Sequence, residues 1–154
     1  MHNRLVLFAA AGLVFIGGLA ARAQQTPGAA TSSTRQTPPT RPGGWTLPPT
    51  ADEEKNPFAG DQKAVAAGKA LYDKTCKRCH GPGGKGDGPD GDPDAMEDMD
   101  LTNPKRVARN PDGIVFYKIW NGRARPKMPA QKDELTKDQV WQIVSYAQTL
   151  RQKP

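Results

Sequence analysis

Cys76-Lys77-Arg78-Cys79-His80 is the stretch of sequence around which the rest of the chain is organised. It holds both cysteines of the 154 residues and one of the two histidines. The other histidine, His2, lies in an N-terminal segment that we expect to be removed, so His80 is the single histidine expected in the mature protein. The thiol and imidazole chemistry of the chain is therefore concentrated in five consecutive residues.

The spacing C-x-x-C-H is typical of covalent attachment of a c-type haem. Two thiols at this spacing reach the two vinyl groups of the porphyrin, and the adjacent imidazole is carried under the iron. We therefore predict one haem c, bound through Cys76 and Cys79, with His80 as an axial iron ligand. Three other interpretations are a disulfide, a thioredoxin-like redox pair and half of a zinc site. A zinc site needs four ligands, and a thioredoxin motif follows a strand, whereas this motif follows a predicted helix.

Residues 1–23 have the pattern of an export signal. A short positive start precedes the apolar run from Leu5 to Ala20, and Ala21-Arg22-Ala23 supplies the small residues of a cleavage site. Loss of Arg4 and Arg22 would lower the net charge from +6 to +4. Sixteen residues fall short of the roughly 20 that a spanning helix needs, so no integral span is expected after cleavage. We expect a periplasmic protein, which would be secreted or membrane-tethered if the signal is retained.

Residues 24–60 are rich in proline and threonine and have few aliphatic side chains. Such a stretch buries too little surface to offset the cost of ordering it, which predicts an extended, disordered linker. Trp45 and Phe58 are its two aromatic residues, for which we expect partial packing on the domain. The folded domain is then predicted to span residues 61–154.

Three helical patterns indicate an all-α domain with long irregular loops. The first begins at an Asp61 cap and runs into Cys76; the second begins near Asn110 and ends at Gly122. The third begins with a capping box at Thr136 and Gln139 and carries an apolar stripe, Val140, Ile143, Val144, Ala147 and Leu150. A hydrophobic content of 36% and a mean hydropathy of −0.72 exclude a polytopic membrane protein.

A methionine is the expected sixth ligand of the iron, and the mature chain offers Met96, Met99 and Met128. Met128 lies between Pro126 and Pro129, which stiffen the loop and lower the entropy of holding a thioether against iron. Met96 and Met99 lie in the acidic stretch 87–100, where surface or gap-filling positions are expected. We therefore predict Met128 as the ligand. A loose calcium site at the aspartates of that stretch remains an alternative.

Residues from about 61 to 151 resemble a class I cytochrome c. The matching features are Gly68 and Tyr72 before Cys76, the run Cys79-His80-Gly81, Asn121-Gly122 ahead of Met128-Pro129, and Trp141 with Tyr146 in the last helix. The resemblance implies a small helical domain wrapped around one haem, with Gly68 where the first and last helices touch. It also implies electron transfer as the activity.

Histidine and methionine ligands fill the coordination of the iron, which favours a one-electron carrier over an enzyme. The alternatives are a haem subunit docked on a periplasmic dehydrogenase or oxidase, and a haem sensor or enzyme with an open sixth position. Redox proteins with an acidic docking face are the expected partners; nucleic acid is not expected for an exported protein. This partner prediction rests on eight basic residues between positions 101 and 132, namely Lys105, Arg106, Arg109, Lys118, Arg123, Arg125, Lys127 and Lys132.

Overall fold

The computed structural model describes residues 40–41 and 44–151. The chain divides into two units, Met1–Arg35 and Gln36–Pro154, and all described residues belong to the second. The predicted signal peptide, 1–23, and residues 24–39 of the predicted linker lie outside the described residues. The elements are β1 (Thr40–Arg41), β2 (Trp45–Thr46), α1 (Gln62–Thr75), α2 (Lys77–His80), η1 (Pro93–Ala95), α3 (Met96–Met99), α4 (Pro104–Val107), α5 (Asp112–Asn121) and α6 (Lys137–Arg151).

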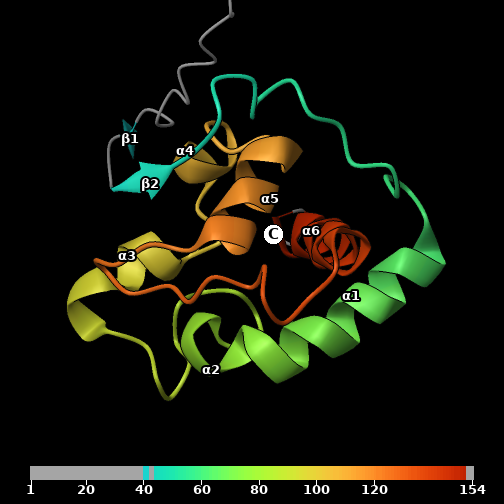
Figure 1. Ribbon diagram of the computed structural model, residues 1–154. Helices are drawn as coiled ribbons and strands as arrows, with labels where there is room; N and C mark the ends of the chain where they lie inside the picture. Colours follow the sequence, from blue (N-terminus) through green and yellow to red (C-terminus); the bar gives the residue numbers. More distant parts are fainter. Residues whose placement is uncertain (1–39, 42–43, 152–154) are drawn as a thin grey trace, which may run out of the picture. The chain divides into compact units, whose positions relative to one another are not determined.

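The predicted all-α architecture is confirmed (Figure 1). Strand structure in the described range is limited to β1 and β2, two residues each, paired antiparallel with Thr40 opposite Thr46. The long helices α1, α5 and α6 carry the core, and short helices interrupt the loops between them. None of the helices within 44–151 has the length and apolar character needed to cross a membrane.

Helix α1 begins where the sequence predicts. The Asp61 carboxylate accepts hydrogen bonds from the backbone N–H groups of Lys63, at 2.8 Å, and Ala64, at 3.3 Å. Gly68 faces α6 so closely that a Cβ atom built on it would lie 1.9 Å from the backbone oxygen of Gln142. The resemblance placed the contact between the first and last helices at this glycine, and the structure confirms it.

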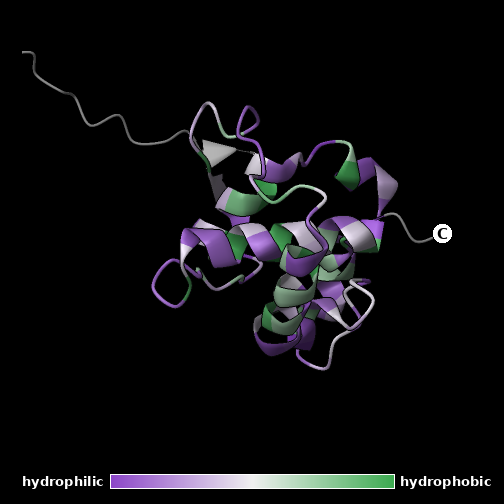
Figure 2. Cartoon of the chain, turned by 90° about the vertical axis from the view of Figure 1, so that its right-hand side faces the viewer, coloured by the Kyte–Doolittle hydropathy of each residue, from purple (hydrophilic) through white to green (hydrophobic). Residues whose placement is uncertain are grey.

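Helix α6 supplies most of the core. The predicted capping box forms: the Thr136 N–H donates to Gln139 Oε1 at 2.9 Å, and the Gln139 N–H donates to Thr136 Oγ1 at 3.3 Å. All five residues of the predicted apolar stripe are buried, namely Val140, Ile143, Val144, Ala147 and Leu150. In Figure 2, hydrophobic and hydrophilic residues both occur within each long helix. This is expected for helices that bury one side in the core and leave the other side in water.

Helix α5 starts two residues after the predicted cap. Its cap position is Pro111, and the Asn110 side chain instead donates to the Arg106 carbonyl and accepts from Lys118 Nζ. Gly122 ends the helix as predicted, with a φ of 61° and its N–H donating to the Lys118 carbonyl at 2.9 Å. The start is later because the Asn110 side chain bonds to Arg106 and to the Lys118 side chain rather than to the backbone N–H groups of the first turn.

Residues 44–60 are part of the folded domain, contrary to the prediction of a disordered linker over 24–60. Trp45, Leu47 and Ala51 are 9%, 1% and 0% exposed, and they form a core cluster with Ile114 of α5. The buried Asn56 side chain donates to Ser145 Oγ of α6 at 2.9 Å. A few buried apolar residues and one buried amide hold this proline-rich segment on the domain. The average composition of residues 24–60 did not indicate this packing.

Candidate haem site

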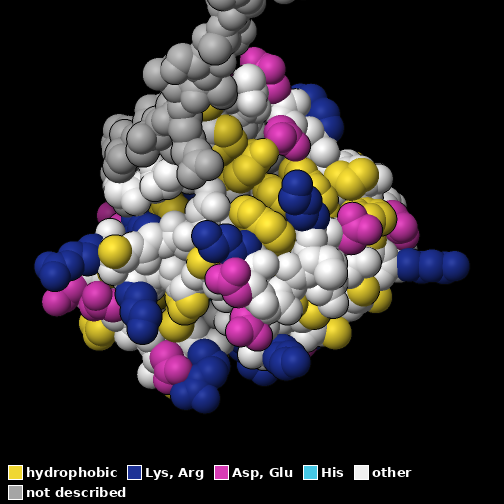
Figure 3. All heavy atoms as spheres, viewed as in Figure 1, with side chains coloured by type: hydrophobic (Ala, Val, Ile, Leu, Met, Phe, Trp, Pro, Cys, Tyr) yellow, Lys and Arg dark blue, Asp and Glu magenta, His cyan; other side chains and the backbone are white. Residues whose placement is uncertain are grey.

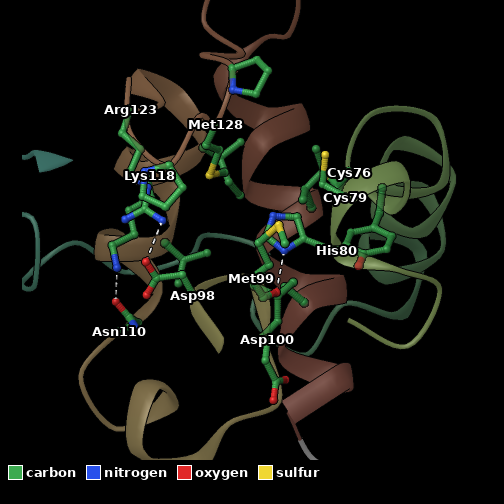
Figure 4. Close-up of a pocket in the computed structure, with 18 of the residues that line it drawn as sticks. Cys76, Cys79, His80, Asp98, Met99, Asp100, Asn110, Lys118, Arg123 and Met128 are labelled. Atoms are coloured by element: carbon green, nitrogen blue, oxygen red, sulfur yellow. Dashed lines mark hydrogen bonds and ion pairs between the residues drawn. The ribbon is translucent and has the colours of Figure 1, made fainter. Parts of the chain in front are cut away.

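One cavity of about 410 Å³ is lined by residues of α2, α5, α6 and the loop that follows α5 (Figure 4). All four predicted site residues line it: Cys76, Cys79, His80 and Met128. Apolar side chains from several elements complete much of its wall, among them Leu101, Val115, Ile119, Ile143 and Ala147. The structure therefore brings the predicted residues, up to 52 positions apart in the sequence, to a single space.

The C-x-x-C-H segment forms one helical turn directly after α1. The backbone N–H groups of Cys79 and His80 donate to the Cys76 carbonyl at 3.2 and 3.0 Å, which turns both thiols and the imidazole toward one space. Both cysteines are free thiols rather than a disulfide. Burial raises the pKa of the Cys76 thiol, so this group is held protonated.

His80 is oriented by a hydrogen bond on its far side. Its Nδ1 lies 2.7 Å from the backbone carbonyl of Met99, and because a carbonyl only accepts, Nδ1 carries the proton. The second ring nitrogen, Nε2, is then the unprotonated one. Burial lowers the pKa of His80, which keeps the imidazole neutral. A neutral imidazole with a fixed tautomer is the form that binds a metal.

Met128 is held by a short loop closed at its base. The Arg123 and Met128 backbones exchange two hydrogen bonds, each 2.9 Å, across the intervening four residues. Gly122 permits this approach, because a Cβ atom there would lie 2.4 Å from the Met128 carbonyl oxygen. Figure 4 shows Met128 and His80 pointing into the cavity from opposite walls.

Tyr72 connects α1 to the residue after His80. Its hydroxyl donates to the Gly81 carbonyl at 2.7 Å, and its ring packs edge-on against Tyr146 at a centroid distance of 5.1 Å. Burial raises the pKa of Tyr72, so the phenol remains a donor at all ordinary pH values. This contact fixes the turn that carries His80 relative to α1 and α6.

The other two methionines have different positions. Met96 is 47% exposed, as expected for a surface residue. Met99 lines the cavity, which the sequence did not indicate, and its carbonyl binds His80. Met99 therefore belongs to the His80 side of the cavity, which leaves Met128 as the methionine on the opposite wall.

Sequence reasoning also missed charged and aromatic side chains in the cavity wall. Trp45, Asp98 and five lysine or arginine residues line it. Trp45 gave a signal as an isolated aromatic residue in a proline-rich segment, and four of the basic residues were expected only as part of a docking surface. The basic residues are separated in sequence and carry no motif; they are Arg106, Lys118, Arg123, Lys127 and Arg151.

The zinc and calcium alternatives find no support in the side-chain arrangement of the described chain. Across residues 40–41 and 44–151, no three His, Cys, Asp or Glu side chains are grouped so that they could hold a metal ion. The carboxylates of the acidic stretch have other roles: Asp92 caps η1, and Asp90 forms an ion pair with Arg78 at 2.6 Å.

Comparison with known proteins gives one family match and two similar solved structures. The family model "Cytochrome c" matches residues 65–151. Cytochrome cL of the marine methylotrophic bacterium Methylophaga aminisulfidivorans is 24% identical with a TM-score of 0.49; the match covers 62% of this chain and 60% of that one. The c-type cytochrome KustC0563 is 24% identical with a TM-score of 0.45, over 55% of this chain and 98% of that one.

A cytochrome c domain implies a covalently bound c-type haem, and the residues of this cavity fit that group. The space is largely apolar, two free thiols stand one helical turn apart on its wall, and a neutral imidazole presents an unprotonated nitrogen. The family model matches more than half of the chain. This chain therefore belongs to the cytochrome c family and carries a covalently bound haem c.

Proposed function

We propose that this protein is a one-electron carrier whose haem is bound through thioethers to Cys76 and Cys79, with His80 and Met128 as the axial ligands. One observation carries the proposal: an imidazole and a thioether enter the same cavity from opposite walls, beside the two thiols (Figure 4). With both axial positions filled by protein, a substrate has no free coordination site. A haem held by these residues would supply a one-electron couple, and His80 and Met128 would stay in place through the change of charge.

The surrounding residues support electron transfer in two ways. The Met99 carbonyl and the Tyr72 hydroxyl hold the His80 turn in one orientation, which lowers the reorganisation that accompanies each change of charge. A thioether is a soft ligand that favours the reduced state, so the haem group supplies a one-electron couple of raised potential.

Export and docking belong to the same proposal. We place the mature protein in the periplasm after cleavage of residues 1–23, with acidic redox proteins as its partners. Five of the eight basic residues on which the partner prediction rests are exposed, namely Lys105, Arg109, Arg125, Lys127 and Lys132. The other three line the cavity and are half-buried. On the face that Figure 3 shows, basic and acidic side chains are intermixed, so we expect steering to be weaker than sequence charge alone indicates.

Absorption spectra of the purified, exported protein test the proposal. Oxidised protein is expected to show a methionine-to-iron band, and reduced protein is expected to leave added carbon monoxide unbound. Met128→Ala is expected to lose that band and bind carbon monoxide, whereas the matched Met96→Ala variant should behave as wild type because Met96 is exposed. Carbon monoxide binding by the wild type would refute the ligation and favour the sensor or enzyme alternative.

The two carrier hypotheses differ in assembly. A free carrier is expected to elute at the size of one chain from native extracts by size-exclusion chromatography. Co-elution of the haem absorbance with a dehydrogenase or oxidase of larger size would favour the docked-subunit alternative.

A further inference from the structure

The Met128 side chain packs against two separate hydrophobic clusters. The first is the core of α5 and α6, whose buried members are Phe116, Ile119, Val140, Trp141, Ile143 and Val144. The second combines Ile114 of α5 with three residues from the N-terminal segment, namely Trp45, Leu47 and Ala51. The family model matches residues 65–151, so those three residues lie outside the match. Part of the packing around Met128 therefore comes from a segment that the family match does not cover.

Residues 44–54, which we call the strap, are held against α5 near both ends of that helix. At the end of α5, the Asn121 side chain donates to the Thr46 carbonyl at 2.9 Å. At its start, a Cβ atom on Gly113 would lie 2.0 Å from the Ala51 carbonyl oxygen, so the strap backbone approaches closer than any side chain would allow. The strap is therefore fixed relative to the helix that precedes the Met128 loop.

The strap also contacts the loop that carries Met128. A Cβ atom on Gly44 would lie 3.8 Å from the Arg125 carbonyl oxygen, which is ordinary van der Waals contact. Leu47 is 1% exposed and is the largest fully buried side chain of the strap. It does not line the cavity, so its influence on the cavity passes through the residues that it packs with. Movement of the strap away from α5 would remove contacts from Met128 and from its loop together.

Packing of this kind bears on how firmly a thioether stays in place. A methionine that ligates a metal is in equilibrium between a bound and a released position, and the packed position is the one that the two clusters favour. An added ligand that competes for the same coordination site binds only the released fraction, so its apparent affinity rises with that fraction. Loss of packing on one side of Met128 is therefore measurable as easier displacement.

We propose that the strap positions Met128: it keeps the thioether at the sixth coordination site and small ligands away from it. Leu47 is the positioning residue, because its buried side chain joins the strap to the cluster that Met128 packs against. The inference rests on the proposed function, since it needs Met128 as an axial ligand. It extends the ligand-holding part of the protein to a segment that composition alone describes as a linker.

The test is an imidazole titration of the oxidised, haem-loaded full-length protein, followed by loss of the methionine-to-iron band. Leu47→Ala should lower the imidazole concentration at the midpoint about tenfold or more, because it enlarges the released fraction of Met128. Leu47→Ile keeps the side-chain volume and should restore the midpoint to within about threefold of wild type.

Leu150→Ala is the matched control. Leu150 is also 1% exposed, but it packs in a different cluster with Tyr72 and Tyr146, to which Met128 does not belong. Urea unfolding should show a loss of stability in both alanine variants, whereas the imidazole midpoint of Leu150→Ala should stay within about threefold of wild type, since distant sites act independently. A midpoint that moves no further in Leu47→Ala than in Leu150→Ala would overturn the inference.

A second variant covers the case in which Leu47→Ala does not fold. Asn121→Ala removes the hydrogen bond to Thr46 and leaves Gly122 and the loop sequence intact. It should lower the imidazole midpoint about threefold, as expected for loss of one hydrogen bond, and an unchanged midpoint would contradict the role of the strap.

The spectrum of the wild-type protein separates failure of this inference from failure of the proposed function. Absence of the methionine-to-iron band before imidazole is added contradicts the proposed ligation by Met128. A normal band, with the same imidazole midpoint in wild type and in the folded strap variants, contradicts the role of the strap alone.

Discussion

Replacing Gly68 by alanine tests the contact on which the helical core depends. A Cβ atom at this position would lie 1.9 Å from the backbone oxygen and 2.4 Å from the backbone carbon of Gln142. Ordinary contact begins near 3.4 Å, so α1 and α6 must separate by about 1.5 Å. Both close atoms belong to the backbone of α6, and no side-chain rotation can relieve the overlap.

The expected loss of stability follows from two opposing effects. Overpacking costs about 1–3 kcal/mol, and a clash with helix backbone belongs at the upper end, about 3 kcal/mol. Alanine is a better helix former than glycine by about 1 kcal/mol, which offsets part of this. The net destabilisation is about 2 kcal/mol. For a domain of this size, that corresponds to a fall in Tm of about 8–16 °C.

Thermal unfolding of the haem-loaded protein, followed by far-UV circular dichroism, measures this difference. Gly83→Ala is the matched control: its Cβ atom would meet nothing nearer than Lys85 Cγ at 4.0 Å, so its stability should stay within about 0.5 kcal/mol of wild type. A Gly68→Ala protein that melts at or above the wild-type temperature would refute the close helix contact, because propensity alone would then govern the site.

Three further predictions concern contacts around the core. Tyr72→Phe removes the buried hydrogen bond to the Gly81 carbonyl and should cost about 1–2 kcal/mol in urea unfolding; an unchanged midpoint would mean that the bond contributes nothing. Asn56→Ala should cost about 1–3 kcal/mol and speed proteolysis within residues 44–60, since it leaves Ser145 without its 2.9 Å donor; equal cleavage rates would show that other contacts hold the segment. For Asp98, burial opposes the charged form, but its two arginine partners outweigh burial and hold the pKa below the usual 3.8. Its stabilisation is therefore present above pH 3.8 and lost as the pH falls through the lowered pKa, so Asp98→Asn should melt below wild type at pH 7 and together with it in strong acid; a pH-independent gap would contradict the ion pairs.

The parts of the structure that were predictable from sequence depend on local chemistry. Asp61 and the pair Thr136 and Gln139 cap their helices as predicted, because capping needs only residues three or four positions apart. Cys76-to-His80 is likewise a local pattern, and Met128 stands out because prolines flank it. All four residues line one cavity, while their bonds to haem remain a prediction.

The features that sequence did not reveal depend on contacts between distant residues. Leu47 and Ala51 are fully buried because α5 offers Ile114 to them, not because their own segment is apolar. Arg106, Lys118 and Arg123 were counted toward a basic docking surface, yet they line the cavity because several elements converge there. A count of charges along the chain contains no information about which side of a loop faces the cavity.

The contact between Gly68 and α6 joins residues 74 positions apart, and this separation has a consequence for the nascent protein. A chain delivered from its N-terminus presents Cys76, Cys79 and His80 long before α6 arrives to pair with α1. Until α6 is in place, α1 has no partner at Gly68, so we expect both thiols to be more accessible then than in the folded domain. Because the packed pair of α1 and α6 closes one side of the cavity, we expect haem attachment to precede the docking of α6.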